Sequence, residues 1–186
     1  MGPWLADTIR QCDGLVDILS YWTFSDVFEE QGVVKQPFYG GYGLIANGGI
    51  PKPSFNAFKL LHNLGQQRLS INSQSALVTK RPDGTVVIAV WNLCDAEESG
   101  TSEQIRFKLP GLMGMPYARV YSLDSAHGST LRRYSEMGKP AYPTAKELWE
   151  LRQNAELPPP VTREISNGEI AIAIPPKGLA ILEFNP

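Results

Sequence analysis

Four side chains that could bind a polar ligand fall within nine residues of the chain. Trp22 is followed by three carboxylates, those of Asp26, Glu29 and Glu30. An indole offers a flat apolar surface, and carboxylates accept hydrogen bonds from hydroxyl groups. A sugar ring has apolar C–H faces and a rim of hydroxyls, so these side chains together suit a carbohydrate. The other interpretation of the two glutamates is that they are solvated carboxylates of a surface loop.

A short apolar run leads into these side chains. Residues 15–24 read LVDILSYWTF, which predicts a strand over Leu15–Phe24 that is buried on both faces. The polar residues begin where this run ends. Because α/β proteins place ligand sites at the C-terminal ends of their strands, we expect the carboxylates to lie in a ligand site at the C-terminal end of this strand.

Glycines and aromatic residues then share one stretch, which reads FYGGYG over residues 38–43. Glycine permits backbone conformations and close approaches that a β-carbon would block. The stretch is therefore either a turn with aromatic packing or part of a site. It is not a phosphate loop, because the Lys-Ser/Thr of a P-loop and the GxGxxG pattern are both missing.

Several of these stretches carry a family resemblance. They read YWTFSDVFEE at 21–30, PFYGGYGL at 37–44 and IPKPSF at 50–55, with Ala57 and Phe58 following. Further along, MGKP at 137–140 and Pro143-Thr144, continuing to Leu151-Arg152, belong to the same pattern. Over most of residues 3–157 the chain resembles glycoside hydrolase family 39, which contains β-xylosidases and, more distantly, α-L-iduronidases.

The resemblance implies a (β/α)₈ barrel followed by a β-sandwich, with retaining hydrolysis of a terminal sugar. In that chemistry two carboxyl groups about 5–5.5 Å apart act as acid/base and nucleophile. The family's acid/base lies in an Asn-Glu-Pro motif on an earlier barrel strand, and this chain contains no such motif. We therefore expect the catalytic pair upstream and assign no catalytic residue here. The resemblance assigns sugar-binding positions to this chain: Trp22, Glu29 and Glu30, with Asp26 and Phe38 in the same motif.

The length of the chain decides how much of that architecture it can hold. A (β/α)₈ barrel needs about 250 residues, whereas this chain has 186. The fold expected is mixed: residues 1–70 form the last strand and helix of a barrel, and residues 71–186 form an antiparallel β-sandwich with one inserted helix. Such a chain alone is expected to be inactive.

Local patterns place the remaining elements. Pro3–Cys12 and Phe55–Arg68 read as helices, with Ser54 as a candidate N-cap of the second. Alternating or apolar runs predict six strands, over 76–80, 85–92, 104–109, 118–123, 168–174 and 179–184, and Pro82-Asp83-Gly84 predicts a hairpin turn between the first two. The capping box of Thr144 and Glu147 predicts a helix to about Ala155.

Composition narrows the possible partners. A net charge of −2 without a basic run argues against nucleic acid, and no apolar stretch approaches the ~20 residues of a membrane span. Cys12 and Cys94 are expected to be free thiols, and the isolated His62 and His127 do not suggest a metal site. No cofactor is expected, and the compartment stays open.

Two classes of function follow. In the first, the chain supplies one wall of a xylosidase-like pocket and its partner is a carbohydrate substrate. In the second, it is a non-catalytic β-sandwich module for carbohydrate binding or oligomer contacts.

The strand predicted at 15–24 would expose both faces without its barrel neighbours. It should therefore be covered by another polypeptide, exchange with a second copy, or dock on the sandwich.

Overall fold

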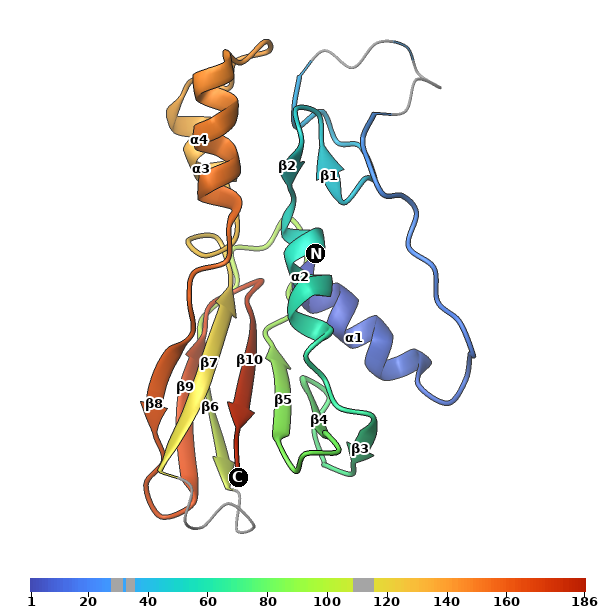
Figure 1. Ribbon diagram of the computed structural model, residues 1–186, viewed down its shortest axis with the longest axis vertical. Coiled ribbons are helices and arrows are strands. Elements are labelled where there is room, and N and C mark those ends of the chain that lie inside the picture. Colours follow the sequence, from blue (N-terminus) through green and yellow to red (C-terminus); the bar gives the residue numbers. More distant parts are fainter. Residues whose placement is uncertain (28–31, 33–35, 109–115) are drawn as a thin grey trace.

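The computed structural model describes residues 1–27, 32, 36–108 and 116–186. Within these residues, helices flank a large antiparallel sheet, a smaller sheet and a short hairpin (Figure 1). The helices are α1 (Gly2–Cys12), α2 (Pro53–Leu61), α3 (Leu131–Glu136) and α4 (Ala145–Ala155). The strands are β1 (Ile45–Ala46), β2 (Ile50–Pro51), β3 (Gln67–Leu69), β4 (Ala76–Lys80), β5 (Val86–Trp91), β6 (Glu103–Lys108), β7 (Tyr117–Leu123), β8 (Val161–Glu164), β9 (Glu169–Ile174) and β10 (Leu179–Phe184).

Two antiparallel sheets pack face to face around one core. The larger sheet has the strand order β3-β4-β5-β10-β7-β8, and β6 pairs with β9 in the smaller one. On β9, Ile170, Ile172 and Ile174 are buried while the residues between them are more exposed. This period of two turns one face of β9 toward Leu182 and Phe184 of the larger sheet. The alternation predicted over 168–174 is thereby confirmed.

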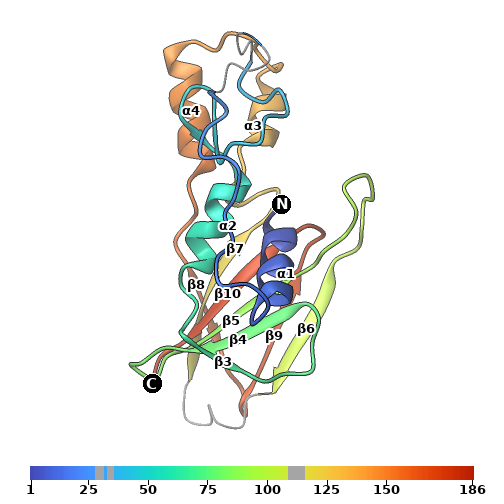
Figure 2. The same cartoon turned by 90° about the vertical axis from the view of Figure 1, so that its right-hand side faces the viewer.

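The central strand β10 is buried along its whole length because both faces of the larger sheet are covered. Leu182 and Phe184 face the smaller sheet, whereas Leu179 and Ile181 belong to the core on the other face. That second core includes Leu5 of α1 and residues of α2. Helices α1 and α2 lie against this face (Figures 1 and 2). The N-terminal helices and the sheets therefore share a hydrophobic core.

A helical excursion leaves the larger sheet between β7 and β8. Its helices α3 and α4 carry Tyr134, Leu151 and Ala155, which form a third core with Ala46 and Ile50 of the β1–β2 hairpin. Figure 2 shows the excursion reaching the same end of the molecule as the loops around β1 and β2. The capping box predicted at the start of α4 is present, whereas α3 and β8 were not predicted.

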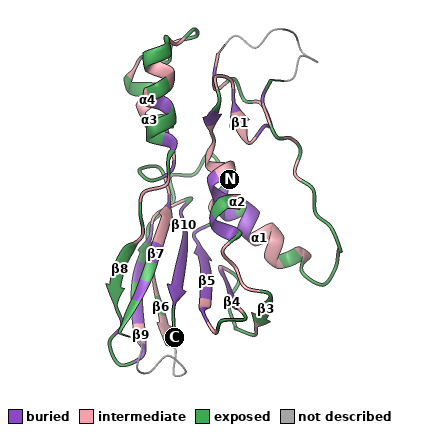
Figure 3. Ribbon diagram, viewed as in Figure 1, coloured by how far each residue is buried: buried purple, intermediate pink, exposed green. Residues whose placement is uncertain are grey.

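The strand predicted over Leu15–Phe24 is wrong in this structure. Residues 15–24, all of them described, form an extended connection between α1 and the hairpin (Figure 3). Leu15, Ile18 and Phe24 are 80%, 84% and 70% exposed. A strand needs a neighbour to bond its backbone groups. Among the described residues, a parallel bridge forms just past this segment, between Ser25 and Ile45.

The helix predicted over Phe55–Arg68 begins earlier and ends sooner. Pro53 opens α2 and Lys52 occupies the N-cap, so the buried Ser54 does not serve as the cap. Residues after the helix turn toward β4, where Gly65 donates a 2.7 Å hydrogen bond to Thr79 Oγ1. Residues 67–69 then pair with β4. Pairing with an open strand edge outweighs the helical pattern of this segment, since local propensity is a weak determinant.

Other predictions are confirmed. Helix α1 covers the range expected, and β4 pairs with β5 as a hairpin. Cys12 and Cys94 are free. Among the helices of the described ranges, none has the length and apolar character needed to cross a bilayer.

Candidate functional site

At the end of the 15–24 segment, the backbone forms hydrogen bonds with a neighbouring stretch of the chain. The N–H of Leu44 donates to the carbonyls of Thr23 and Phe24 at 2.9 and 3.1 Å, and the N–H of Asp26 donates to Ile45 at 2.8 Å. Residues 23–26 thus run beside residues 44–45. Trp22 stands at the beginning of this pairing, where its side chain is 68% exposed and its peptide bond to Thr23 is cis.

Asp26 lies beneath this surface and is 1% exposed. The Nζ atom of Lys52 lies 2.7 Å from Oδ1 and 2.6 Å from Oδ2 of its carboxylate. Oδ1 also accepts a 2.6 Å hydrogen bond from the N–H of Gly43. Burial of a charge is tolerated where an opposite charge and hydrogen bonds accompany it. Direct contact of Asp26 with a sugar stays a prediction, and the geometry shows it bound to protein partners.

The glycines of the FYGGYG stretch have distinct steric roles. A β-carbon on Gly43 would collide with the backbone of Ser25 and Asp26, and one on Gly41 would lie 2.7 Å from Asp26 Oδ1. Gly40 adopts a φ of +98°, which favours glycine. The glycines therefore allow the chain to pass close over Asp26, and a ligand-binding role for this stretch stays a prediction.

Phe38 packs against the helical excursion. It is half-buried, and its ring meets that of Tyr134 on α3 edge to face, with centroids 4.9 Å apart. Burial raises the pKa of Tyr134, whose hydroxyl donates to the carbonyl of Pro140 at 3.0 Å. A sugar contact for Phe38 stays a prediction. Its observed contact joins the loop to the helical excursion.

Arg152 of α4 makes a second connection between the excursion and this region. Its Nε donates a 2.8 Å hydrogen bond to the carbonyl of Gly48, in the turn between β1 and β2. Gly48 has a φ of +83° and packs under Leu148. The loop containing the candidate site is thus held from one side by α3 and α4.

The two glutamates expected to bind hydroxyls, Glu29 and Glu30, lie outside the described residues. Among the described residues at this site, Asp26 supplies a carboxylate, and Lys52 and Gly43 occupy it. No group of three or more potential metal ligands occurs in the described ranges. Among its described residues, the site therefore offers an exposed aromatic surface at Trp22 and a buried carboxylate, that of Asp26, which is paired with Lys52.

Sequence reasoning missed two residues of the site. Lys52 neutralises Asp26, and the hydroxyl of Tyr39 donates a 2.9 Å hydrogen bond to the Asp26 carbonyl. The signal for Lys52 was its place between Pro51 and Pro53 in the IPKPSF stretch. No pattern in the sequence indicated its partner, which is 26 residues away.

Comparison with known proteins places these residues in a family. The pattern of the family described as "Glycosyl hydrolases family 39" matches residues 3–168. A β-xylosidase of Geobacillus stearothermophilus is 33% identical over 145 residues, which cover 78% of this chain and 29% of that protein. A β-xylosidase of Caldicellulosiruptor saccharolyticus is 32% identical over 143 residues, covering 74% of this chain and 29% of the relative.

A solved structure agrees along the entire chain. The crystal structure of a monomeric β-xylosidase from Caulobacter crescentus CB15 superimposes with a TM-score of 0.83 at 25% sequence identity. The superposition covers 100% of this chain and 41% of the solved one. This chain accordingly spans less than a third of the length of the two curated relatives and about two fifths of that structure.

Proposed function

Because the chain belongs to glycosyl hydrolases family 39, we propose that it is the C-terminal part of a retaining glycoside hydrolase of the β-xylosidase type. Its catalytic glutamate pair would lie upstream of these residues. In this proposal residues 1–70 complete a (β/α)₈ barrel, with the 15–24 segment as its last strand and α2 as its last helix. Residues 71–186 form the accessory β-sandwich that carries the α3–α4 excursion.

One observation carries the proposal. An apolar segment with exposed side chains at Leu15 and Ile18 leads to an exposed Trp22, and the backbone after Trp22 is hydrogen-bonded to Leu44 and Ile45. A barrel strand would present its ligand-binding residues at this C-terminal end. The coverage of the relatives supports the same interpretation, because most of their length has no counterpart in this chain.

The residues of this chain would bind the sugar and leave the bond cleavage to the upstream pair. The indole of Trp22 would flank the apolar face of the ring, and Glu29 and Glu30 would accept hydrogen bonds from its hydroxyls. Hydrogen bonds to charged groups contribute about 1.5–3 kcal/mol each. Such contacts locate the anomeric carbon between the two upstream carboxyl groups, where retaining chemistry requires it.

The partner implied by this arrangement is the polypeptide that carries the rest of the barrel. It would cover the 15–24 segment by pairing with its backbone and burying its apolar side chains. A carbohydrate of the xyloside type would be the substrate of the assembled protein.

The experiment measures hydrolysis of an aryl β-xyloside by two forms of the protein. The 186-residue chain is expected to be inactive, and a form extended upstream through its reading frame to a complete barrel is expected to be active. In the active form, Trp22→Ala and Glu30→Ala should each lower kcat/KM at least about tenfold. Turnover by the 186-residue chain, or unchanged kinetics in both variants, would contradict the proposal.

A further inference from the structure

The carboxylate of Asp26 is committed to protein partners before any ligand arrives. Its side chain is 0% exposed, and each oxygen lies within 2.7 Å of Lys52 Nζ. Oδ1 accepts the additional hydrogen bond from Gly43. With these contacts and no exposed surface, the carboxylate is engaged by groups of the protein itself in this structure.

The ammonium group of Lys52 also donates a hydrogen bond to the glycine-rich stretch at 38–43. Its Nζ donates a 2.7 Å hydrogen bond to the carbonyl of Gly41 while it pairs with Asp26. The backbone of Lys52 is extended, and proline follows and precedes it. Proline restricts both its own backbone and that of the residue before it. The two prolines therefore restrict the backbone conformation of the residue that carries this ammonium group.

The contacts together close the two ends of one loop. Asp26 lies where the chain leaves the paired segment, and Gly41 and Gly43 lie where it returns. The hydroxyl of Tyr39 adds a 2.9 Å bond to the Asp26 carbonyl on the same returning arm. We call this set of residues the Asp26 latch: Asp26, Tyr39, Gly41, Gly43 and Lys52.

The latch lies next to the backbone pairing that directly follows Trp22. The register of residues 23–26 beside 44–45 begins next to Gly43, because Leu44 donates to Thr23 and Phe24 directly after it. Loss of the hydrogen bond between Gly43 and Asp26 would weaken the first hydrogen bonds of this pairing, those from Leu44 to Thr23 and Phe24. Trp22 is the residue immediately before it and would lose the support of its neighbouring strand.

We propose that Asp26 and Lys52 are positioning residues, which hold the returning arm of the loop and thereby orient the Trp22 wall of the sugar site. The part of this inference that concerns sugar binding rests on the proposed function. The part that concerns the loop is a property of the 186 residues themselves. A different measurement tests each part.

The first measurement is amide hydrogen exchange at Gly43, followed by NMR in the 186-residue chain. Lys52→Met should speed exchange at Gly43 at least about tenfold, since the acceptor Asp26 loses the charge that holds it in place. Lys59→Met, on the exposed side of helix α2, which Lys52 precedes as its N-cap, is the matched control and should leave this rate unchanged. Amides of the buried strand β10 should keep their protection in both variants.

A second variant covers the case in which Lys52→Met unfolds the chain. Asp26→Asn keeps the size of the side chain and the acceptor for Gly43 but removes the ion pair. It should raise exchange at Gly43 by a smaller factor, about threefold, while the sheet stays protected. Exchange at Gly43 equal to that of the unmodified chain in a folded Lys52 or Asp26 variant would overturn the latch.

The second measurement is steady-state kinetics in the upstream-extended enzyme with an aryl β-xyloside. Lys52→Met should raise KM about tenfold and change kcat less, because it disturbs a binding wall and spares the reacting groups. An unchanged KM at a temperature where the variant is folded would overturn the link to the sugar site. Inactivity of the unmodified extended enzyme would instead remove the proposed function, and the exchange results would still decide the latch.

Discussion

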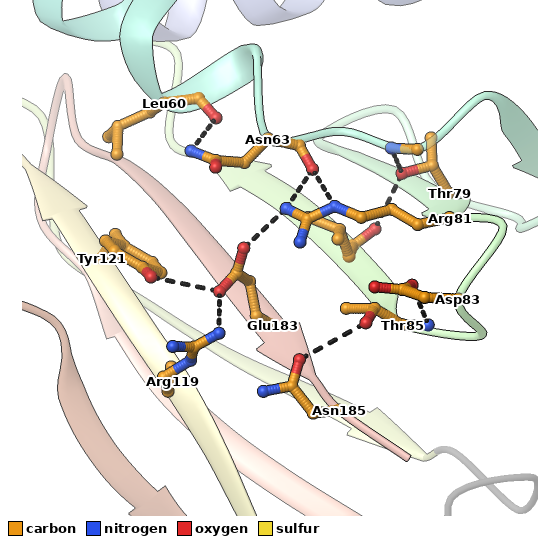
Figure 4. A network of polar contacts seen from close by, with 12 residues as sticks. Leu60, Asn63, Thr79, Arg81, Asp83, Thr85, Arg119, Tyr121, Glu183 and Asn185 are labelled. Carbon is orange, nitrogen blue, oxygen red and sulfur yellow. Dashed lines mark hydrogen bonds and ion pairs between the residues drawn. The ribbon is translucent and has the colours of Figure 1, made fainter.

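Oε1 of Glu183 lies 2.6 Å from the guanidinium of Arg81 on the face of the larger sheet that α1 and α2 cover. The Glu183 side chain is 3% exposed, and its other oxygen accepts from Tyr121 at 3.1 Å and pairs with Arg119 at 3.0 Å (Figure 4). Burial, and the nearby Glu183 carboxylate, raise the pKa of Tyr121, which keeps its hydroxyl a donor. Arg81 also donates to the carbonyl of Asn63 just past α2. This cluster joins the helical region to the sheets.

Replacement of Arg81 tests that connection. Arg81→Met should lower the free energy of unfolding by about 1–3 kcal/mol, because Glu183 loses a partner in a buried setting and the Asn63 carbonyl loses its donor. Arg119 and Tyr121 remain, which limits the loss. Urea denaturation measures the change, with Arg106→Met on the exposed side of β6 as the control. Equal stability of the Arg81 and Arg106 variants would show that the connection contributes nothing.

The capping box of α4 should control the helical excursion. The Thr144 hydroxyl accepts from the Glu147 N–H at 3.3 Å, and the Thr144 N–H donates to Glu147 Oε2 at 2.7 Å. Thr144→Ala should cost about 0.5–2 kcal/mol of stability and loosen the contact of α4 with the β1–β2 hairpin. Hydrogen exchange of residues 145–150 measures it. Thr144→Ser keeps the acceptor and should restore protection; equal exchange in the two variants would argue against the cap.

Two carboxylates make stability depend on acid pH. Hydrogen bonds from Thr144, the backbone one first, lower the pKa of Glu147 below its ordinary 4.5. The backbone of Thr85 likewise lowers the pKa of Asp83 below 3.8. A depressed pKa in the folded state contributes stability that is present above the ordinary value and is lost as the pH falls through the folded pKa.

Melting temperature as a function of pH checks this sign. Between neutral pH and the acid range below 4.5, Glu147→Gln should show a smaller fall in Tm than the unmodified chain, because one of the linked carboxylates is gone. The exposed Glu97→Gln serves as the control and should follow the unmodified curve. A steeper fall for the Glu147 variant would contradict the assignment.

The exposed apolar side chains of residues 15–24 should cause the 186-residue chain to self-associate. Leu15 and Ile18 are more than three quarters exposed, and contiguous apolar surface of this kind promotes self-association. Ile18→Lys should shift the chain toward the monomer and reduce binding of an apolar dye, whereas Leu93→Lys, a partly exposed residue elsewhere, should not. Sedimentation at several concentrations measures the association. A monodisperse monomer at high concentration in the unmodified chain would contradict the expectation.

Short-range patterns predicted many elements of the fold well. The alternation of Ile170, Ile172 and Ile174, and the capping box at Thr144, are local signals whose physical cause lies within a few residues. The resemblance to the family is also confirmed, since its motifs are strings of neighbouring residues. Local reasoning failed at 67–69. The helical pattern predicted that these residues belong to a helix, but in the structure they pair with the edge of β4.

At the site, the residue types pointed to a carbohydrate, yet they did not tell which side chains face outward. Trp22 and Asp26 are four residues apart in one motif, and one is exposed while the other is fully buried. The buried Asp26 pairs with Lys52, which approaches it across the fold. A contact over 26 positions leaves no periodic signal in the chain.

By itself, the sequence determined the family, the paired strands of the sheet core and the capped helix, because each follows from neighbouring residues. The tertiary structure alone decided that Leu15–Phe24 forms no strand, that Asp26 closes a loop, and that Glu183 joins α2 to the sheets. These outcomes depend on which hydrogen-bonding and charged partners the folded chain brings within reach. Such partners are distant in sequence, so only the arrangement of the elements in space reveals them.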